Sequence, residues 1–163
     1  MKWRISHRFD KVACRIADRH YNRRKVGSPQ FSPPGRLLVL LDHNNDALWT
    51  SSWQLPDYIL HQWKDAWVNT LFRNEGSTLS SELITDAVAA TLWKWGDPPS
   101  DGMITFVDPS KVRKKRDFGR CYRKAGFKHV GYTKDKNLVA LQLLPQSMPQ
   151  AQPPTETQME LAL

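Results

Sequence analysis

The sequence predicts one α/β (α+β) domain with a mixed β-sheet, and three observations lead to this prediction. Strand-like and helix-like segments are interspersed along the chain, pairs of strands that suit hairpins stand near both ends of the predicted sheet, and no internal repeat is found. The 163 residues, of which 40% are apolar and seven are tryptophan, suffice for one buried core. We expect this domain to span residues 1–145, with a Pro- and Gln-rich disordered tail over 146–163.

The first half of the chain predicts one helix and three strands. Val12, Ile16 and His20 share one stripe of a helix over residues 10–24, so His20 and Tyr21 come at its C-terminal end. The apolar run RLLVLL is typical of a buried strand. The segments after this helix are a strand over 36–41, a turn over 42–46, a returning strand over 47–53, a loop or short helix over 54–66, and a strand over 67–72. Most of the tryptophans in these segments are expected in the core, although an aromatic wall for a base is the alternative.

The second half predicts a long helix followed by a smaller α/β portion. Leu83, Ala87 and Val88 belong to an apolar stripe that runs from Leu79 to Trp95, the spacing of a helix with one buried face. Ser80 is a suitable cap for this helix. The later segments are a strand over 103–107, a helix over 117–125, and a hairpin of 127–133 with 138–144.

The turn between the strand over 67–72 and the long helix is a candidate phosphate site. Its residues are Arg73, Asn74, Glu75, Gly76, Ser77 and Thr78. A glycine in a strand-to-helix turn lets backbone N–H groups point outward, and the helix dipole adds partial positive charge there. The alternative is that Gly76 only makes the turn.

Basic charge is concentrated in two segments. Residues 1–36 hold ten Lys/Arg against two acids, residues 110–136 hold eleven against two, and the chain as a whole has a net charge of +8. Such segregation indicates a polyanionic partner, first of all nucleic acid, although a solvated basic surface is the plain alternative. The candidate phosphate-gripping residues are Arg23, Arg24, Lys25, Lys111, Arg113, Lys114, Lys115 and Arg116.

The sequence argues against a membrane protein and a disulfide framework. No apolar run approaches the ~20 residues that a membrane-spanning helix needs, and MKWRISHRFD lacks the apolar region of a signal peptide. Cys14 and Cys121 are far apart and have no metal-type spacing, which fits a reduced cytoplasmic compartment. A homodimer is left open.

The order of elements resembles the GNAT acyltransferase fold, and two motifs add to this. Arg73–Thr78 is similar to the R/Q-x-x-G-x-G/A loop that holds the pyrophosphate of acyl-CoA in that family, with Thr78 in place of the last Gly or Ala. Tyr122-Arg123-Lys124-Ala125-Gly126-Phe127 looks like a segment whose tyrosine often serves as the general acid. The resemblance implies acetyl-CoA or another acyl-CoA as donor, with Arg73–Thr78 binding it and Tyr122 as proton donor.

A second resemblance is more specific. The segments IADRHYNRRKVGSPQF, FRNEG, ITFVDPSKVRKKRD and GRCYRKAGF look like the Mom-type DNA-modification proteins of bacteriophages. That resemblance implies a phage or prophage enzyme of the host cytoplasm that acts on double-stranded DNA, converts adenine to N6-carbamoylmethyladenine and so protects DNA from restriction. It implies His20, Tyr21, Arg73, Asp108 and Tyr122 as catalytic residues.

The chemistry of adenine N6 explains why such residues would be needed. This amine is a poor nucleophile because its lone pair is delocalised into the ring, so an enzyme must extrude it from the duplex, position it and take up a proton. Asp108 would accept that proton, and His20 and Tyr21 would line the pocket. Simple acetyl transfer does not yield a carbamoylmethyl group, so the donor stays open. A metal held by His20, Tyr21 and Asp108 is conceivable, but no strong ligand motif supports one.

Other functions fit the sequence less well. An ordinary GNAT N-acetyltransferase for a protein or small-molecule amine explains both GNAT-like motifs but neither the basic segments nor the His20-Tyr21 pair. Asp97-Pro98-Pro99-Ser100 lacks the aromatic residue of an adenine methyltransferase signature, and no P-C-x-x-C of a zinc deaminase is present. A small non-enzymatic DNA-binding protein would also use the basic surface.

Overall fold

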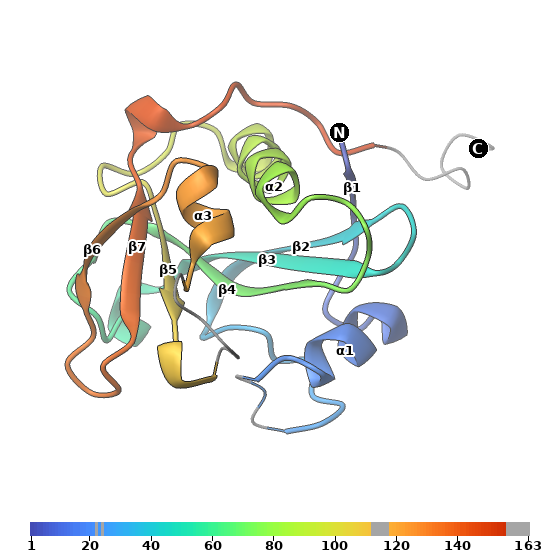
Figure 1. Cartoon of the computed structure of the whole chain (residues 1–163), viewed down its shortest axis with the longest axis horizontal. Helices are drawn as coiled ribbons and strands as arrows, with labels where there is room; N and C mark the ends of the chain where they lie inside the picture. The colour runs from blue at the N-terminus through green and yellow to red at the C-terminus, as the bar shows by residue number, and fades with distance from the viewer. Residues whose placement is uncertain (22, 24, 112–117, 156–163) are drawn as a thin grey trace.

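A computed structural model of the chain describes residues 1–21, 23, 25–111 and 118–155 and shows a mixed seven-stranded sheet between helices (Figure 1). The strand order is β1-β2-β3-β4-β5-β7-β6. The strands are β1 (Trp3–Ile5), β2 (Gly35–Asp42), β3 (Ala47–Gln54), β4 (Trp67–Asn74), β5 (Met103–Val107), β6 (Lys128–Tyr132) and β7 (Val139–Leu143). The helices are α1 (Lys11–Asp18), α2 (Ser80–Trp95) and α3 (Arg120–Lys124), with short 3-10 turns at Pro56–Tyr58, Pro109–Lys111 and Pro145–Ser147.

The sheet confirms the predicted mixed topology. β4 and β5 are parallel, with register from Trp67–Met103 to Asn69–Thr105, and both strands continue beyond that register. The other neighbouring strands are antiparallel. The pairing of β3 with β4 shifts register between Thr50 and Ser51, which marks a β-bulge. The bulge and the separation of β4 from β5 fall on the same part of the sheet.

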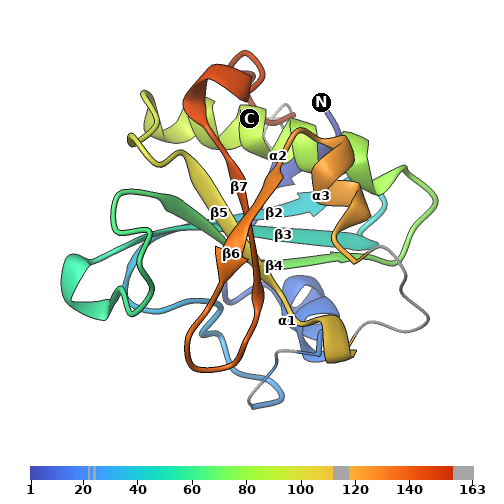
Figure 2. The same ribbon diagram turned by 60° about the vertical axis from the view of Figure 1, so that its left-hand side comes forward.

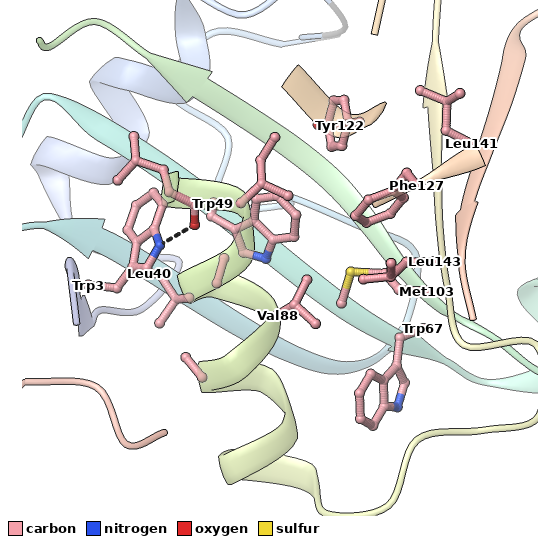
Figure 3. Packing of buried hydrophobic residues seen from close by; sticks show 14 of the residues in the cluster. Trp3, Leu40, Trp49, Trp67, Val88, Met103, Tyr122, Phe127, Leu141 and Leu143 are labelled. Atoms are coloured by element: carbon pink, nitrogen blue, oxygen red, sulfur yellow. Dashed lines mark hydrogen bonds between the residues drawn. The ribbon is translucent and has the colours of Figure 1, made fainter. Parts of the chain in front are cut away.

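Helices α2 and α3 cover one face of the sheet and α1 covers the other, as both views show (Figures 1 and 2). The core under α2 includes Trp3, Trp49 and Trp67, each fully buried (Figure 3). The Trp3 indole N–H donates to the carbonyl of Leu83 in α2 over 2.8 Å, which ties β1 to that helix. A second cluster lies between α1 and the opposite face, with Ile16 and Leu71 among its members. The prediction that most tryptophans belong to the core is confirmed.

Several boundaries differ from the predictions because local packing decides them. α1 begins after Asp10, whose carboxylate accepts from the Val12 N–H at 2.8 Å, but it ends at Asp18, not near residue 24. Tyr21 therefore lies outside the helix. α2 begins after Leu79, without a side-chain cap, so Ser80 does not cap it as predicted. β1 was not predicted, since three residues are too few for a periodic pattern.

The segment after β7 is ordered further than the sequence suggests. The Gln152 N–H donates to the Ala89 carbonyl in α2 and the Thr155 N–H to the Trp3 carbonyl in β1. Residues 146–155 therefore lie against the domain, in contrast to the disordered tail expected from residue 146, and 156–163 lie outside the described residues. Among the described helices, none is long and apolar enough to cross a membrane.

Candidate functional site

A cleft of about 760 Å³ opens on the α1 side of the sheet, where β3, β4 and β5 are adjacent. One wall is made by the sheet, with Gln54, Val68 and Phe106, and the other by the segment that follows α1. The remaining lining residues are Tyr21, Arg23, Lys25, Ser28, Gln30, Phe31, Ser32, Pro33, Asn69, Thr70, Leu71, Asp108, Lys111, Lys136 and Leu138. The cleft thus brings together residues from both basic segments of the sequence.

Two of the predicted catalytic residues meet in this cleft. The backbone N–H of Asp108, just after β5, donates to the Tyr21 hydroxyl at 3.4 Å. The His20 ring stacks on Tyr21 with ring centroids 4.4 Å apart. Burial and the nearby Asp108 carboxylate raise the pKa of Tyr21, so its hydroxyl stays protonated at neutral pH. This corner can hold a polar group between a phenol and a carboxylate.

Asp108 is better placed as a hydrogen-bond acceptor than as a strong base. Its carboxylate accepts from the Ser110 hydroxyl at 2.6 Å and from the Ser110 N–H at 3.0 Å. The Ser110 hydroxyl bond is the main cause that lowers the pKa of Asp108. A carboxylate with a lowered pKa takes up a proton less readily, but it can still orient an amine N–H.

Tyr122 lies behind the cleft and not in its lining. The ring is buried, and its hydroxyl donates to Oδ1 of Asn69 at 2.6 Å. Burial raises the pKa of Tyr122 well above its usual value. Asn69, which does line the cleft, therefore links Tyr122 to it. Proton donation by Tyr122, as predicted, requires that its hydrogen bond to Asn69 be exchanged.

The predicted phosphate loop is held mainly by its own hydrogen bonds. The Asn74 amide donates to the Thr78 carbonyl and the Ser80 hydroxyl, while its oxygen accepts from the Gly76 N–H. The Glu75 N–H donates to the Asp46 carbonyl, and the Asp46 carboxylate packs so closely on Gly76 that a Cβ there would collide with it. Glycine at this position makes room for a carboxylate of the protein itself.

Glu75 joins this loop to α1. Arg19, the residue that follows α1, bonds both Glu75 carboxylate oxygens at 2.6 Å, and Arg73 Nε bonds one of them at 2.7 Å. The Arg19 hydrogen bond is the largest cause that lowers the pKa of Glu75 to about 2. Arg73 is therefore ion-paired with Glu75 in the structure.

The loop fits a phosphate-bearing donor in part. The N–H groups of Glu75 and Gly76 already form hydrogen bonds within the protein. The groups that remain to bind phosphate oxygens are therefore at Ser77, Thr78 and the uncapped start of α2. Against this, Glu75 and Asp46 place acidic groups beside the loop, and the shared hydrogen bond with Asp42 and burial raise the pKa of Asp46 to about 6. The Arg73 guanidinium offsets part of that charge.

The basic residues separate into structural and exposed groups. Arg23 is nearly buried, with its guanidinium on the Asp18 carboxylate at 2.9 Å and on the carbonyls of Ser28 and Gln30, so it organises the loop after α1. Lys25, Lys111 and Lys136 are exposed at the edge of the cleft. The other predicted DNA-binding residues, Arg24, Arg113, Lys114, Lys115 and Arg116, lie outside the described residues.

Within the described ranges, no cluster of three or more His, Cys, Asp or Glu could hold a metal ion.

Sequence reasoning missed most of the cleft lining, including Gln54, Asn69, Phe106 and Lys136. Asn69 and Phe106 lie within predicted strands, and Gln54 just after one, where side chains are ordinarily assigned to core or solvent. A polar residue such as Asn69 within an apolar strand is one signal that could have been used. Lys136 belongs to the basic segment over 110–136 but was assigned only to a turn.

Neither protein-family models nor curated proteins match the sequence. Solved structures of the aminoglycoside acetyltransferase AAC(6')-Ib match the fold. Its complex with coenzyme A and kanamycin has a TM-score of 0.62 and 16% identity, covering 90% of this chain and 95% of that chain. Its coenzyme A complex has a TM-score of 0.61 and 17% identity, covering 90% of this chain and 95% of that chain. Its complex with ribostamycin and coenzyme A has a TM-score of 0.61 and 16% identity, covering 90% of this chain and 94% of that chain. At this level of identity the likeness concerns the fold, and the chain has the GNAT acyltransferase-like fold that the order of its elements predicts.

Proposed function

We propose that the chain is a transferase that moves a group from an acyl-CoA-type donor to an amine held in the cleft. The observation that carries this proposal is the meeting of Tyr21 and Asp108 in a cleft of a GNAT-like sheet, beside the place where β4 and β5 stop pairing. The acetyltransferases with this fold were solved with coenzyme A or acetyl-CoA. Such a donor supplies an activated acyl thioester.

The residues of the chain have distinct tasks in this proposal. Asp108 accepts a hydrogen bond from the amine and so orients its lone pair, and Tyr21, with His20 stacked on it, closes that side of the cleft. Ser77, Thr78 and the start of α2 hold the donor phosphates together with Arg73. In the ordinary acyl transfer, a C–N bond forms, the thioester C–S bond breaks, and the amine loses a proton as the thiolate gains one.

The first candidate acceptor is a small-molecule or protein amine. It is favoured by the fold comparison, because the matched acetyltransferases act on aminoglycosides by name. The test is release of free thiol from acetyl-CoA in the presence of amine substrates. We expect turnover in the wild type and at least a tenfold loss in Asp108→Ala, because the amine loses the acceptor that orients it. The matched control is Asp57→Ala, an exposed acid outside the cleft.

The second candidate is the N6 amine of adenine in DNA, modified as in the Mom-type proteins. The exposed Lys25, Lys111 and Lys136 favour it, because they would attract phosphates and repel an acceptor that carries several ammonium groups. Simple acyl transfer does not make a carbamoylmethyl group, so acyl-CoA alone does not account for the donor of this reaction.

Mass spectrometry of DNA distinguishes the two acceptors. A plasmid from bacteria that express the chain is digested to nucleosides, and the deoxyadenosine fraction is compared with that from the variant His20→Ala/Tyr21→Phe. A heavier deoxyadenosine in the wild type alone supports DNA as the acceptor. Tyr58→Phe, in the 3-10 turn outside the cleft, serves as control and should behave as the wild type. Unmodified DNA together with thiol release on amines would support the first candidate. The absence of both a modified deoxyadenosine and thiol release would refute the proposed activity.

A further inference from the structure

The Tyr122 phenol is committed to a hydrogen bond inside the protein. Its hydroxyl donates to Oδ1 of Asn69 at 2.6 Å, and the Thr105 hydroxyl donates to the same oxygen at 3.0 Å. The Asn69 Nδ2 donates to the carbonyls of Thr50 and Leu71, each at 3.0 Å. All four hydrogen-bonding positions of this amide are therefore in use, and a flipped amide would set its oxygen against two carbonyl oxygens. A group in the cleft could take the Tyr122 proton only after this arrangement is broken.

The Tyr21 phenol has the opposite arrangement, with its oxygen held and its proton available. Tyr21 lines the cleft and is 45% exposed. The backbone N–H of Asp108 donates to the phenol oxygen at 3.4 Å, which occupies a lone pair of that oxygen. A phenol also has one proton to donate, and within the part of the chain that the structure describes no group accepts it. The Tyr21 proton is therefore available to a group bound in the cleft.

Stacking and electrostatics suit Tyr21 to proton donation. The His20 ring stacks on Tyr21, with ring centroids 4.4 Å apart, and so restrains the phenol. Burial, and to a smaller extent the Asp108 carboxylate, raise the pKa of Tyr21, so the phenol keeps its proton at neutral pH. Burial is also the main cause that raises the pKa of Tyr122, and the charges of Cys121 and Tyr21 add to it. This influence of Tyr21 on Tyr122 shows that the two phenols lie in the same part of the molecule.

We propose that Tyr21, and not Tyr122, is the general acid of the acyl transfer in this cleft. As the amine nitrogen forms its bond to the carbonyl carbon, the C–S bond breaks and its electron pair goes to sulfur, which takes the Tyr21 proton. The proton that the nitrogen gives up then converts the phenolate back to the phenol, so only the amine and the thioester are consumed. The Asp108 N–H stabilises the phenolate, because it bonds the oxygen on which the negative charge forms. The inference deepens the proposed function and rests on it.

The test places difluorotyrosine, a more acidic phenol of nearly the same shape, at position 21 of the full-length chain. A general acid must carry its proton, so kcat for thiol release from acetyl-CoA falls as the pH rises through the pKa of the phenol. With difluorotyrosine at position 21 this fall should begin at a lower pH than in the wild type, whereas the same analogue at position 122 should not move it. Tyr21→Phe should lower kcat by roughly a hundredfold with little change in KM. The matched control is Tyr58→Phe, in the 3-10 turn outside the cleft, which should behave as the wild type.

A second readout needs no turnover. In fluorine NMR spectra, added coenzyme A should shift the resonance of difluorotyrosine at position 21, because the thiol binds beside that phenol. The same analogue at position 58 should not respond. An unchanged resonance at position 21 in the presence of saturating coenzyme A would overturn the assignment.

The outcomes separate the general acid from the function itself. If the wild type releases no thiol, the proposed activity fails and the assignment of Tyr21 with it. If the wild type turns over and its pH profile responds to position 122 and not to position 21, only the assignment is overturned. A fluorine shift without the change in pH profile would make Tyr21 a contact of the donor and refute its role as acid. Difluorotyrosine keeps the ring and the hydroxyl, so it covers the case in which Tyr21→Phe fails to fold.

Discussion

At the scale of single residues, the Asn69 side chain forms hydrogen bonds with four other residues. Its Oδ1 accepts from Tyr122 and from the Thr105 hydroxyl, and its Nδ2 donates to the carbonyls of Thr50 and Leu71, which flank the β-bulge. One amide thereby joins β3, β4, β5 and α3 at the place where the parallel strands separate. A bonded network of this kind fixes geometry because each partner would be orphaned without it.

Removing this amide should cost more stability than removing the hydroxyl that it binds. Tyr122→Phe loses one hydrogen bond and leaves Asn69 Oδ1 with Thr105, so we expect a loss of about 1 kcal/mol in the free energy of unfolding. Asn69→Ala leaves several buried groups unpaired and should cost roughly 2–4 kcal/mol. Urea unfolding of both variants and of the double variant measures this. Strict additivity in the double variant would contradict the network.

Glu75 should make stability depend on pH in the acid range. Its folded pKa of about 2 lies below the usual 4.5, so the contribution is present above pH 4.5 and is lost as the pH falls toward 2. The difference in unfolding free energy between wild type and Glu75→Gln should shrink over that window. Arg19→Gln should reproduce most of the effect, because its hydrogen bond to Glu75 is the main cause. Arg15→Gln, one turn earlier and with no ion pair in the described part of the chain, is the control.

At the scale of elements, the β4–α2 loop has two structural roles. It turns the chain from the strand into the helix, and it packs against the β2–β3 turn, whose Asp46 contacts Gly76. The loop is therefore braced from both sides, by Asp46 at Gly76 and by Arg19 at Glu75. Such bracing holds the donor loop and the end of α1 in one arrangement.

Substitution of Gly76 should show that the close contact is with Asp46. Gly76→Ala places a Cβ against the carboxylate, and overpacking of this kind costs roughly 1–3 kcal/mol. Asp46→Ala in the same chain should restore much of that loss. The melting temperatures of the two single variants and the double variant decide it, with Ser77→Ala as an exposed neighbouring control. Equal losses in Gly76→Ala with and without Asp46 would point to backbone conformation as the cause.

At the scale of the whole molecule, the fold gathers basic residues that are distant in sequence. Lys25 follows α1, Lys111 follows β5, and Lys136 lies between β6 and β7, yet all three line one cleft. Chain folding and not local sequence therefore creates this positive surface.

If DNA binds there, its affinity should depend steeply on salt. Each phosphate contact contributes about 0.9 to the slope of log K against log salt for duplex DNA, so each of Lys25→Ala and Lys136→Ala should lower the slope by about that amount. Fluorescence anisotropy across a salt series measures it. Lys94→Ala, at the end of α2 on the opposite face, should leave the slope unchanged. Slopes that do not respond to Lys25 or Lys136 would place the DNA elsewhere.

Much of the fold follows from the sequence itself. The apolar runs of β2, β3 and β5 and the long stripe of α2 were predicted because burial imposes a period that local sequence must carry. The pairing of His20 with Tyr21 and the strand-end place of Asp108 were likewise evident along the chain. The meeting of Tyr21 with Asp108 in one cleft depends on which elements become neighbours, and no local pattern encodes that.

What the sequence determined by itself is the type and order of the elements, the basic character of two segments and the GNAT-like order that the structure confirms. Tertiary structure alone decided that Arg23 is internal, that Glu75 holds Arg19 and Arg73, and that Tyr122 is tied to Asn69. It also decided that Gln54 of β3 and Phe106 of β5 line one cleft. The physical reason is range: helix and strand preferences arise between residues a few positions apart, whereas hydrogen bonds and ion pairs in the site join residues that only the folded chain brings within 3 Å or so of each other.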